Sequence, residues 1–118
     1  MFGFINKYRD LLRLRRAVLM ADNAHLEDGE RYYVMPTADG KLMVMDRRNF
    51  RIMKKKGYIN SDARVNDLVS ECFYCTPYRN GDGELPPDVV ARKRRQYLAW
   101  AGVHRKIRRM AHGSQGRH

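Results

Sequence analysis

Residues 30–46 read Glu-Arg-Tyr-Tyr-Val-Met-Pro-Thr-Ala-Asp-Gly-Lys-Leu-Met-Val-Met-Asp, and this stretch decides the fold class. Its two ends, residues 30–35 and 41–46, are rich in Tyr, Val and Met, which are common in strands or tolerated there. The segment between them contains Pro36 and ends in Asp39-Gly40, a strong short-range signal of a tight turn. The stretch therefore predicts a β-hairpin.

Both predicted strands are apolar on both faces. Neighbouring side chains of a strand point to opposite faces, yet residues 32–35 and 42–45 are apolar or aromatic throughout. An isolated two-stranded hairpin is only marginally stable in water. We therefore expect helices, or another subunit, to cover the hairpin on both sides, which gives an α+β fold.

A first helix is predicted over residues 5–20. Apolar residues that recur at helical spacing form its expected inner face: Ile5, Tyr8, Leu11, Leu12, Val18 and Leu19. Arg9, Arg13 and Arg16 form a stripe on the opposite side. Arg15 falls inside the apolar arc, where either its stem packs and its guanidinium reaches an edge, or the arc is a partner surface. Asp22-Asn23 and then Asp28-Gly29 mark the expected exit from this helix.

Two short helices are predicted after the hairpin. The first covers residues 47–56 and ends before Gly57, since glycine accepts the left-handed conformation found at helix C-termini. The second covers residues 63–74, where apolar residues at helical spacing include Leu68 and Cys72.

A long basic helix is predicted to begin at Pro86-Pro87-Asp88 and to run to Met110 or Ala111. Its expected inner face consists of Val90, Tyr97, Trp100, Ala101, His104 and Ile107, with Leu98 on the outer arc. The chain is thus predicted to be a single basic domain over residues 1–112, with a flexible tail over residues 113–118. In order, it has an N-terminal helix, a β-hairpin and three further helices.

The chain is strongly basic. It has 118 residues, with 24 Lys and Arg against 13 Asp and Glu, a net charge of +11 and a pI near 10.1. Such a charge attracts polyanions, above all nucleic acid. No apolar run approaches the roughly 20 residues that span a bilayer, so no membrane partner is expected. Two cysteines give no disulfide framework, and we expect a cytoplasmic protein.

We expect the basic helices to contact phosphates. One stripe lies on the short helix and consists of Arg47, Arg51, Lys54 and Lys55. The long C-terminal helix adds Arg95, Arg105, Lys106 and Arg109. Tyr58, Tyr74 and Tyr78 are candidates to stack on unpaired bases. The hypothesis is a non-enzymatic nucleic-acid-binding protein, with DNA and RNA both left open; solvated helix faces are the simpler alternative.

Cys72 and Cys75 suggest other chemistry. Together with His104 and His112 they give four donors of the kinds that bind zinc, although the two histidines are eight residues apart on a helix. A redox role is disfavoured, because thiolates are stabilised at helix N-termini and these cysteines fall at a predicted C-terminus. His25, which lies near carboxylates, is the candidate for acid–base catalysis. No common catalytic or cofactor motif is present, so no catalytic residue, metal ligand or cofactor is assigned.

An interaction protein is the alternative function. Acidic and basic blocks alternate along the chain, which suits pairing between subunits of a homo-oligomer or with a charged protein partner. Such a protein is an adaptor or inhibitor of the phage or mobile-element type that docks on a protein or nucleoprotein machine. Leu98 and Arg15 are the positions that we expect at a protein contact.

The hairpin carries the run Asp39-Gly40-Lys41-Leu42-Met43-Val44-Met45, followed by an arginine and then Lys56-Gly57-Tyr58-Ile59. This run resembles the swapped-hairpin bacterial transcription factors. The Ile-Pro step of that family is missing here, so the resemblance assigns no role to any residue.

Overall fold

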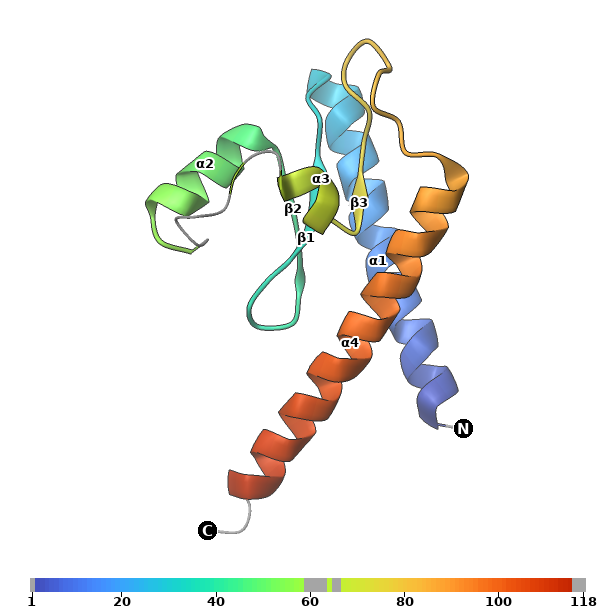
Figure 1. Ribbon diagram of the computed structural model, residues 1–118, viewed down its shortest axis with the longest axis vertical. Helices are drawn as coiled ribbons and strands as arrows, with labels where there is room; N and C mark the ends of the chain where they lie inside the picture. The colour runs from blue at the N-terminus through green and yellow to red at the C-terminus, as the bar shows by residue number, and fades with distance from the viewer. Residues whose placement is uncertain (1, 59–63, 65–66, 116–118) are drawn as a thin grey trace.

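The described part of the chain folds into helices around a small sheet. A computed structural model describes residues 2–58, 64 and 67–115. In chain order the elements are α1 (Phe2–Asp28), β1 (Tyr33–Pro36), β2 (Leu42–Met45), α2 (Arg47–Lys55), α3 (Asp67–Glu71), β3 (Tyr74–Cys75) and α4 (Pro87–Gln115). The predicted α+β class is confirmed, with a helix before the hairpin and a long helix at the C-terminal end (Figure 1).

The predicted hairpin is confirmed. Among the described residues it is part of a three-stranded antiparallel sheet with the order β2-β1-β3. Val34 pairs with Val44 on one side and with Tyr74 on the other. At the turn, Gly40 has a φ of +85°, which favours glycine, and its amide donates to the Thr37 carbonyl over 3.2 Å.

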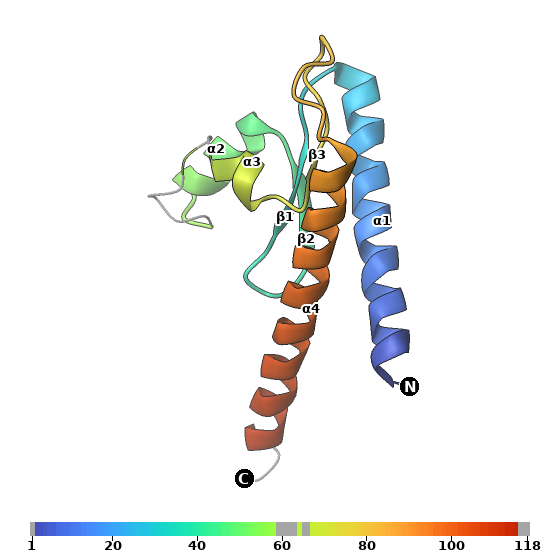
Figure 2. The same cartoon turned by 45° about the vertical axis from the view of Figure 1, so that its right-hand side comes forward.

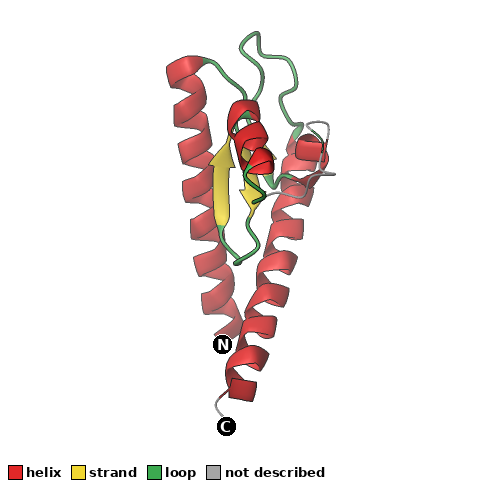
Figure 3. Cartoon of the chain, turned by 90° about the vertical axis from the view of Figure 1, so that its left-hand side faces the viewer, coloured by secondary structure: helices red, strands yellow, loops and turns green. Residues whose placement is uncertain are grey.

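Helices cover both faces of the sheet, as the apolar pattern predicts (Figure 3). One face carries Tyr33 and Cys75 and packs against Phe50 of α2 and Leu68 of α3. The other face carries Val34 and packs against α1 and α4. Alternating side chains of the same strands therefore belong to two core clusters on opposite sides of the sheet.

The first helix is longer than predicted and buries a different face. It continues to Asp28 rather than ending near residue 20. Its buried residues are Asp10, Leu14, Ala17 and Ala21. Of the residues predicted to face inward, Ile5, Tyr8 and Leu19 are exposed, and Arg15, placed in the same arc, is exposed as well.

Small side chains explain this orientation of α1. Ala17 and Ala21 let the helix approach the sheet and α4 closely, and Leu14 fills the space beside them. The helix continues past Asp22, whose carboxylate accepts a hydrogen bond from the Tyr74 hydroxyl (2.6 Å), and it ends at the second expected exit, where Gly29 has a φ of +76°. The other three residues of the predicted apolar face, Leu11, Leu12 and Val18, are half-buried.

The long C-terminal helix begins as predicted and ends later. It runs from Pro87 to Gln115, so residues 113–115 of the expected tail are helical, and residues 116–118 lie outside the described residues. Most of its predicted inner face is buried or half-buried, but Ile107 is 57% exposed because α4 continues past the hairpin (Figure 1). Leu98 was wrongly placed on the outer arc: it is half-buried and packs against the core cluster of α1 and α4.

The short basic helix α2 is confirmed. The Asp46 carboxylate accepts a hydrogen bond from the Asn49 amide (2.7 Å) and caps its N-terminus. At the other end, Gly57 has a φ of +84° and the Tyr58 amide donates to the Met53 carbonyl (3.0 Å). Phe50 is the buried residue of α2, so a single side chain anchors the helix to the sheet.

The helix predicted over residues 63–74 is present but shorter, and residues 63, 65 and 66 lie outside the described residues. Within the described residues α3 covers Asp67–Glu71, and the chain then becomes the strand β3. The free edge of β1 provides the reason, since the Phe73 amide donates to the Val34 carbonyl and the Thr76 amide to the Tyr32 carbonyl, each over 2.9 Å. Pairing with this edge replaces the helical hydrogen bonds.

Candidate nucleic-acid interface

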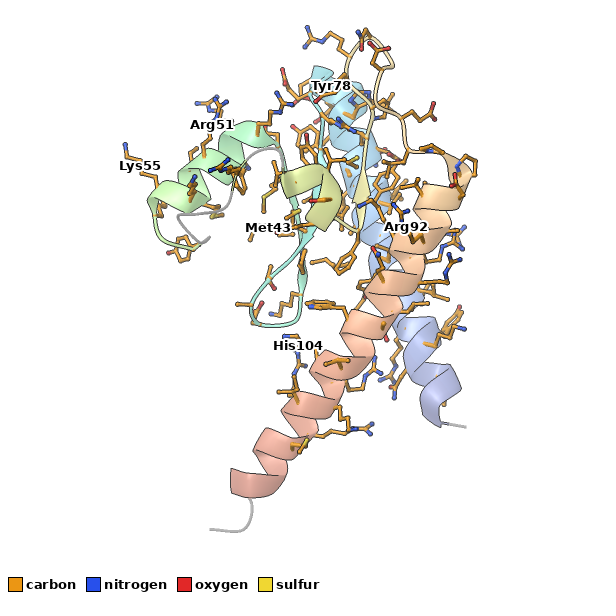
Figure 4. The ribbon with its side chains drawn as sticks, in the orientation of Figure 1. Met43, Arg51, Lys55, Tyr78, Arg92 and His104 are labelled. Atoms are coloured by element: carbon orange, nitrogen blue, oxygen red, sulfur yellow. The ribbon has the colours of Figure 1, made fainter. Side chains whose placement is uncertain are left out.

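Helix α2 presents basic side chains to solvent. Arg47, Arg51 and Lys55 are exposed, and Lys54 is half-buried. Arg51 and Lys55 point away from the sheet (Figure 4). Among the described residues no carboxylate forms an ion pair with these side chains. The residues predicted on this helix therefore lie together on one basic surface.

The three tyrosines named as stacking candidates differ in accessibility. Tyr58 is 77% exposed. Tyr74 is half-buried, and its hydroxyl is engaged by Asp22. The guanidinium groups of Arg31 and Arg47 lie over the ring of Tyr78. Their Cζ atoms are 4.4 and 5.4 Å from the centroid of that ring. These cation–π contacts compete with base stacking, so Tyr58 is the accessible candidate.

The four residues predicted on α4 are of two kinds. Arg95, Lys106 and Arg109 are exposed. Arg105 donates to the carboxylate of Asp10, and the two side chains are 30% and 5% exposed. The carboxylate of Asp10 is therefore buried with a cationic partner, and this ion pair joins α4 to α1.

A polar cavity of 210 Å³ lies between α1, α4 and the tip of the hairpin. Four arginines line it, two from each helix, and together they form what we call the arginine seam: Arg9, Arg13, Arg105 and Arg108. Asp10 is the acidic residue among the lining side chains. The seam thus has an excess of positive charge around a space that admits a small anionic group.

The hairpin tip closes one end of the seam. Arg108 donates to the Asp39 carbonyl (3.2 Å). His104 lies beside the tip (Figure 4), and a Cβ on Gly40 would come within 2.8 Å of its ring and of the Arg108 guanidinium. The Nδ1 atom of His104 is buried and has no hydrogen-bond partner among the described residues. A polar group in the cavity would find donors and an unpartnered ring nitrogen nearby.

The predicted basic residues do not form one continuous surface. Figure 2 shows α1 and α4 on one side of the sheet and α2 and α3 on the other. The α2 set therefore lies across the sheet from the α4 set. What the structure does bring together is Arg105 of α4 with Arg9 and Arg13 of α1.

Several of these residues were not predicted as site residues. Arg9, Arg13 and Arg108 belong to basic patterns visible in the sequence, but nothing in the sequence indicates that the two helices meet. Lys93, part of the basic run of α4, is 4% exposed and donates to the carbonyls of Val69 and Cys72, so it is not a surface charge.

Of the four zinc donors considered from the sequence, Cys72 and Cys75 lie on the other side of the sheet from His104. Cys72 and Cys75 are buried on the α2 and α3 side of the sheet. His104 packs against Trp100, with ring centroids 5.2 Å apart, on the α4 side. The side chain of His112 lies outside the described residues, and among the described residues no cluster of three or more His, Cys, Asp or Glu could hold a metal ion.

His25, the candidate acid–base residue, is engaged in the chain itself. Its Nδ1 atom lies 2.7 Å from the Glu30 carbonyl oxygen, and it donates a hydrogen bond there. This contact ties the last turn of α1 to the following loop, which is a structural role. The assignment of no catalytic residue stays a prediction.

The chain matches no protein-family model, and no curated protein or solved structure shows significant similarity to it. In the described part of the chain no helix combines the length and the apolar character needed to cross a membrane.

Proposed function

We propose that the protein binds nucleic acid without catalysing a reaction, and that the arginine seam holds phosphate groups. The observation that carries the proposal is the convergence of Arg9, Arg13, Arg105 and Arg108 on one 210 Å³ polar cavity. A guanidinium group donates in a planar fork that matches phosphate oxygens. Asp10 offsets one of these charges, so the seam keeps a net attraction for anions.

Helix α2 supplies a second basic surface in this proposal. Its exposed residues Arg47, Arg51 and Lys55 are suited to contact the sugar–phosphate backbone, and Tyr58 lies just beyond them. Exposed Arg95, Lys106 and Arg109 add further positive charge to α4. A cytoplasmic setting is part of the proposal, since Cys72 and Cys75 are both free.

Fluorescence anisotropy with labelled single-stranded RNA, single-stranded DNA and duplex DNA tests the proposal. The protein is first treated with nuclease and washed at high salt. We expect binding that weakens steeply as salt rises, because phosphate contacts release counterions. Absence of binding to all three ligands at low salt would overturn the proposal. A preference among the ligands distinguishes base stacking from groove binding.

A second candidate function is protein interaction through α1, and a specific surface favours it. The helix exposes an apolar stripe opposite its buried face: Ile5, Tyr8, Leu19 and Leu26 are 47%, 59%, 59% and 81% exposed. Ile5, Leu19 and Leu26 fall at heptad spacing together with half-buried Leu12, whereas Arg15 and Asp22 take two of the alternating positions beside Tyr8. The occupant that fits best is α1 of a second copy in antiparallel orientation. Basic residues dominate the first part of α1, and Glu27 and Asp28 follow near its end, so antiparallel pairing brings opposite charges together.

A further inference from the structure

Two buried cations lie beside the cysteine pair. Lys93 is 4% exposed, and its ammonium donates to the carbonyls of Val69 and Cys72, each over 2.8 Å. Arg31 is 7% exposed and donates to the carbonyls of Thr76 and Gly83, each over 2.8 Å. Both cations are thus held in the interior by neutral carbonyl groups.

Buried charges in proteins are normally paired with an opposite charge. Among the described residues neither Arg31 nor Lys93 forms an ion pair with a carboxylate. Besides the rings of Tyr33 and Tyr78, Arg31 contacts Cys75, and its Nη2 atom lies 3.2 Å from the Cys75 Sγ atom. A thiolate at Cys75 supplies the negative charge that this interior otherwise lacks.

Cys72 is placed to react with Cys75. It follows the last turn of α3, whereas Cys75 ends β3, and both side chains are 1% exposed in the same core cluster. The neighbouring Cys72 thiol, together with the charges of Arg31 and Lys93, lowers the pKa of Cys75 to about 6. The neighbouring Cys75 and burial raise the pKa of Cys72 above its ordinary value. The contacts of the two sulfurs also differ, since Arg31 donates to Cys75, whereas the Cys72 thiol donates to the Val69 carbonyl over 3.4 Å.

We propose that Cys72 and Cys75 form a redox-active dithiol in which Cys75 attacks a small hydroperoxide and Cys72 then closes a disulfide. Arg31 holds the attacking sulfur as a thiolate, and Lys93 adds a second positive charge. The small size of the oxidant follows from the burial of both sulfurs. Arg31 also lines an open cavity of 580 Å³ at the surface, which brings solvent close to its guanidinium.

The reaction balances with one hydroperoxide. The Cys75 sulfur attacks a peroxide oxygen, the O–O bond breaks, and the leaving hydroxide or alkoxide takes a proton from water. The Cys72 thiol then releases its proton, its sulfur attacks the Cys75 sulfenic acid, and the hydroxide that leaves combines with that proton. The two cysteines lose two electrons. Hydrogen peroxide is thereby reduced to two molecules of water, and an organic hydroperoxide to one alcohol and one water.

The decisive experiment compares folded and unfolded protein. The reduced full-length protein is treated with hydrogen peroxide at pH 6, in buffer and in urea, and disulfide formation is followed by alkylation and mass spectrometry. We expect the folded protein to react about tenfold faster, because its larger thiolate fraction outweighs the lower nucleophilicity of a weakly basic thiolate. Slower reaction of the folded protein would overturn the proposal, since folding then only protects two structural thiols.

Three variants separate the roles of the residues. In Cys72→Ser, peroxide should leave a sulfenic acid on Cys75 that a dione reagent traps. In Cys75→Ser, Cys72 should remain a thiol under the same conditions. In Lys93→Met, the folded protein should oxidise several times more slowly while its circular dichroism stays unchanged. Equal trapping at both positions, or an unchanged rate in Lys93→Met with the fold intact, would contradict the assigned roles.

Discussion

The Tyr74 hydroxyl donates a hydrogen bond to the Asp22 carboxylate over 2.6 Å and so fastens β3 to α1 across 52 residues of sequence. The contact uses a carboxylate within α1 and lies beside the strand that pairs with β1. It therefore links the helix to the edge of the sheet where residues 74–75 are held by backbone hydrogen bonds.

Replacing Tyr74 by phenylalanine should lower the free energy of unfolding by about 1.5–3 kcal/mol, the usual range for a hydrogen bond to a charged group. Urea unfolding at pH 7 measures the change. Burial and the bond to Asp22 raise the pKa of Tyr74, so its contribution is present below the ordinary tyrosine pKa and is lost at strongly alkaline pH. Tyr8→Phe, at an exposed site of α1, is the control and should change little.

The arginine seam should be more important for nucleic-acid binding than net charge alone. Arg13→Glu alters the seam, and Arg15→Glu makes the same change of charge on the outer side of the same helix. We expect Arg13→Glu to weaken binding about tenfold more than Arg15→Glu does. The slope of log affinity against log salt concentration should fall in magnitude by about 0.9 for each duplex phosphate that the variant no longer neutralises. Equal reductions of affinity in the two variants would remove the seam from the interface.

Helix α2 should contribute to binding without affecting stability. Replacing Arg51, Lys54 and Lys55 together by glutamate should reduce the affinity for nucleic acid and flatten its salt dependence. The thermal midpoint should change little, because Phe50 anchors the helix and remains in place. Anisotropy and thermal unfolding measure the two effects. Unchanged affinity in a folded triple variant would exclude α2 from the interface.

The outer stripe of α1 should mediate self-association if the second candidate function is correct. Multi-angle light scattering of nuclease-treated protein should then show a dimer that Leu19→Glu converts to a monomer. Leu19 is 59% exposed within one chain, so this change should leave the fold intact. A monomer at every concentration would rule out pairing through this face.

The free energy of unfolding should rise with pH in the range where Cys75 is ionised in the folded protein but still protonated in the unfolded chain. Its pKa is lowered to about 6 from an ordinary value of 9.0, so the unfolded chain binds more protons between these values. Under reducing conditions the free energy of unfolding should increase from about pH 6 to pH 9, by at most about 1.4 kcal/mol per pH unit. Urea unfolding of the wild type and Cys75→Ser isolates the effect, since the extra slope should vanish in the variant.

Local patterns in the sequence were sufficient for the hairpin, for α2 and for the start of α4. Each depends on residues close in the chain: Asp39-Gly40 at the turn, Asp46 and Gly57 at the ends of α2, and Pro87 in the first turn of α4. Turn and cap preferences are set by a few neighbouring residues. The apolar composition of both strands also indicated that helices would cover the sheet on both sides.

Residues 73–74 and the buried face of α1 show where local patterns fail. The helical pattern of the sequence continues to Phe73, but the Phe73 amide donates to Val34 at the open edge of β1, which only the folded chain presents. Likewise, two faces of α1 are apolar by sequence, and the face with Ala17 and Ala21 is buried because small side chains permit close packing.

The sequence by itself determined the α+β class, the basic character and the identity of the exposed cations on α2. Only the tertiary structure decided which cations act together. It joined Arg9 and Arg13 to Arg105 in the seam, and it placed Arg31 beside Cys75, 44 residues later in the chain. The physical reason is that electrostatic interactions depend on distance and burial in space, and neither is specified by spacing along the chain.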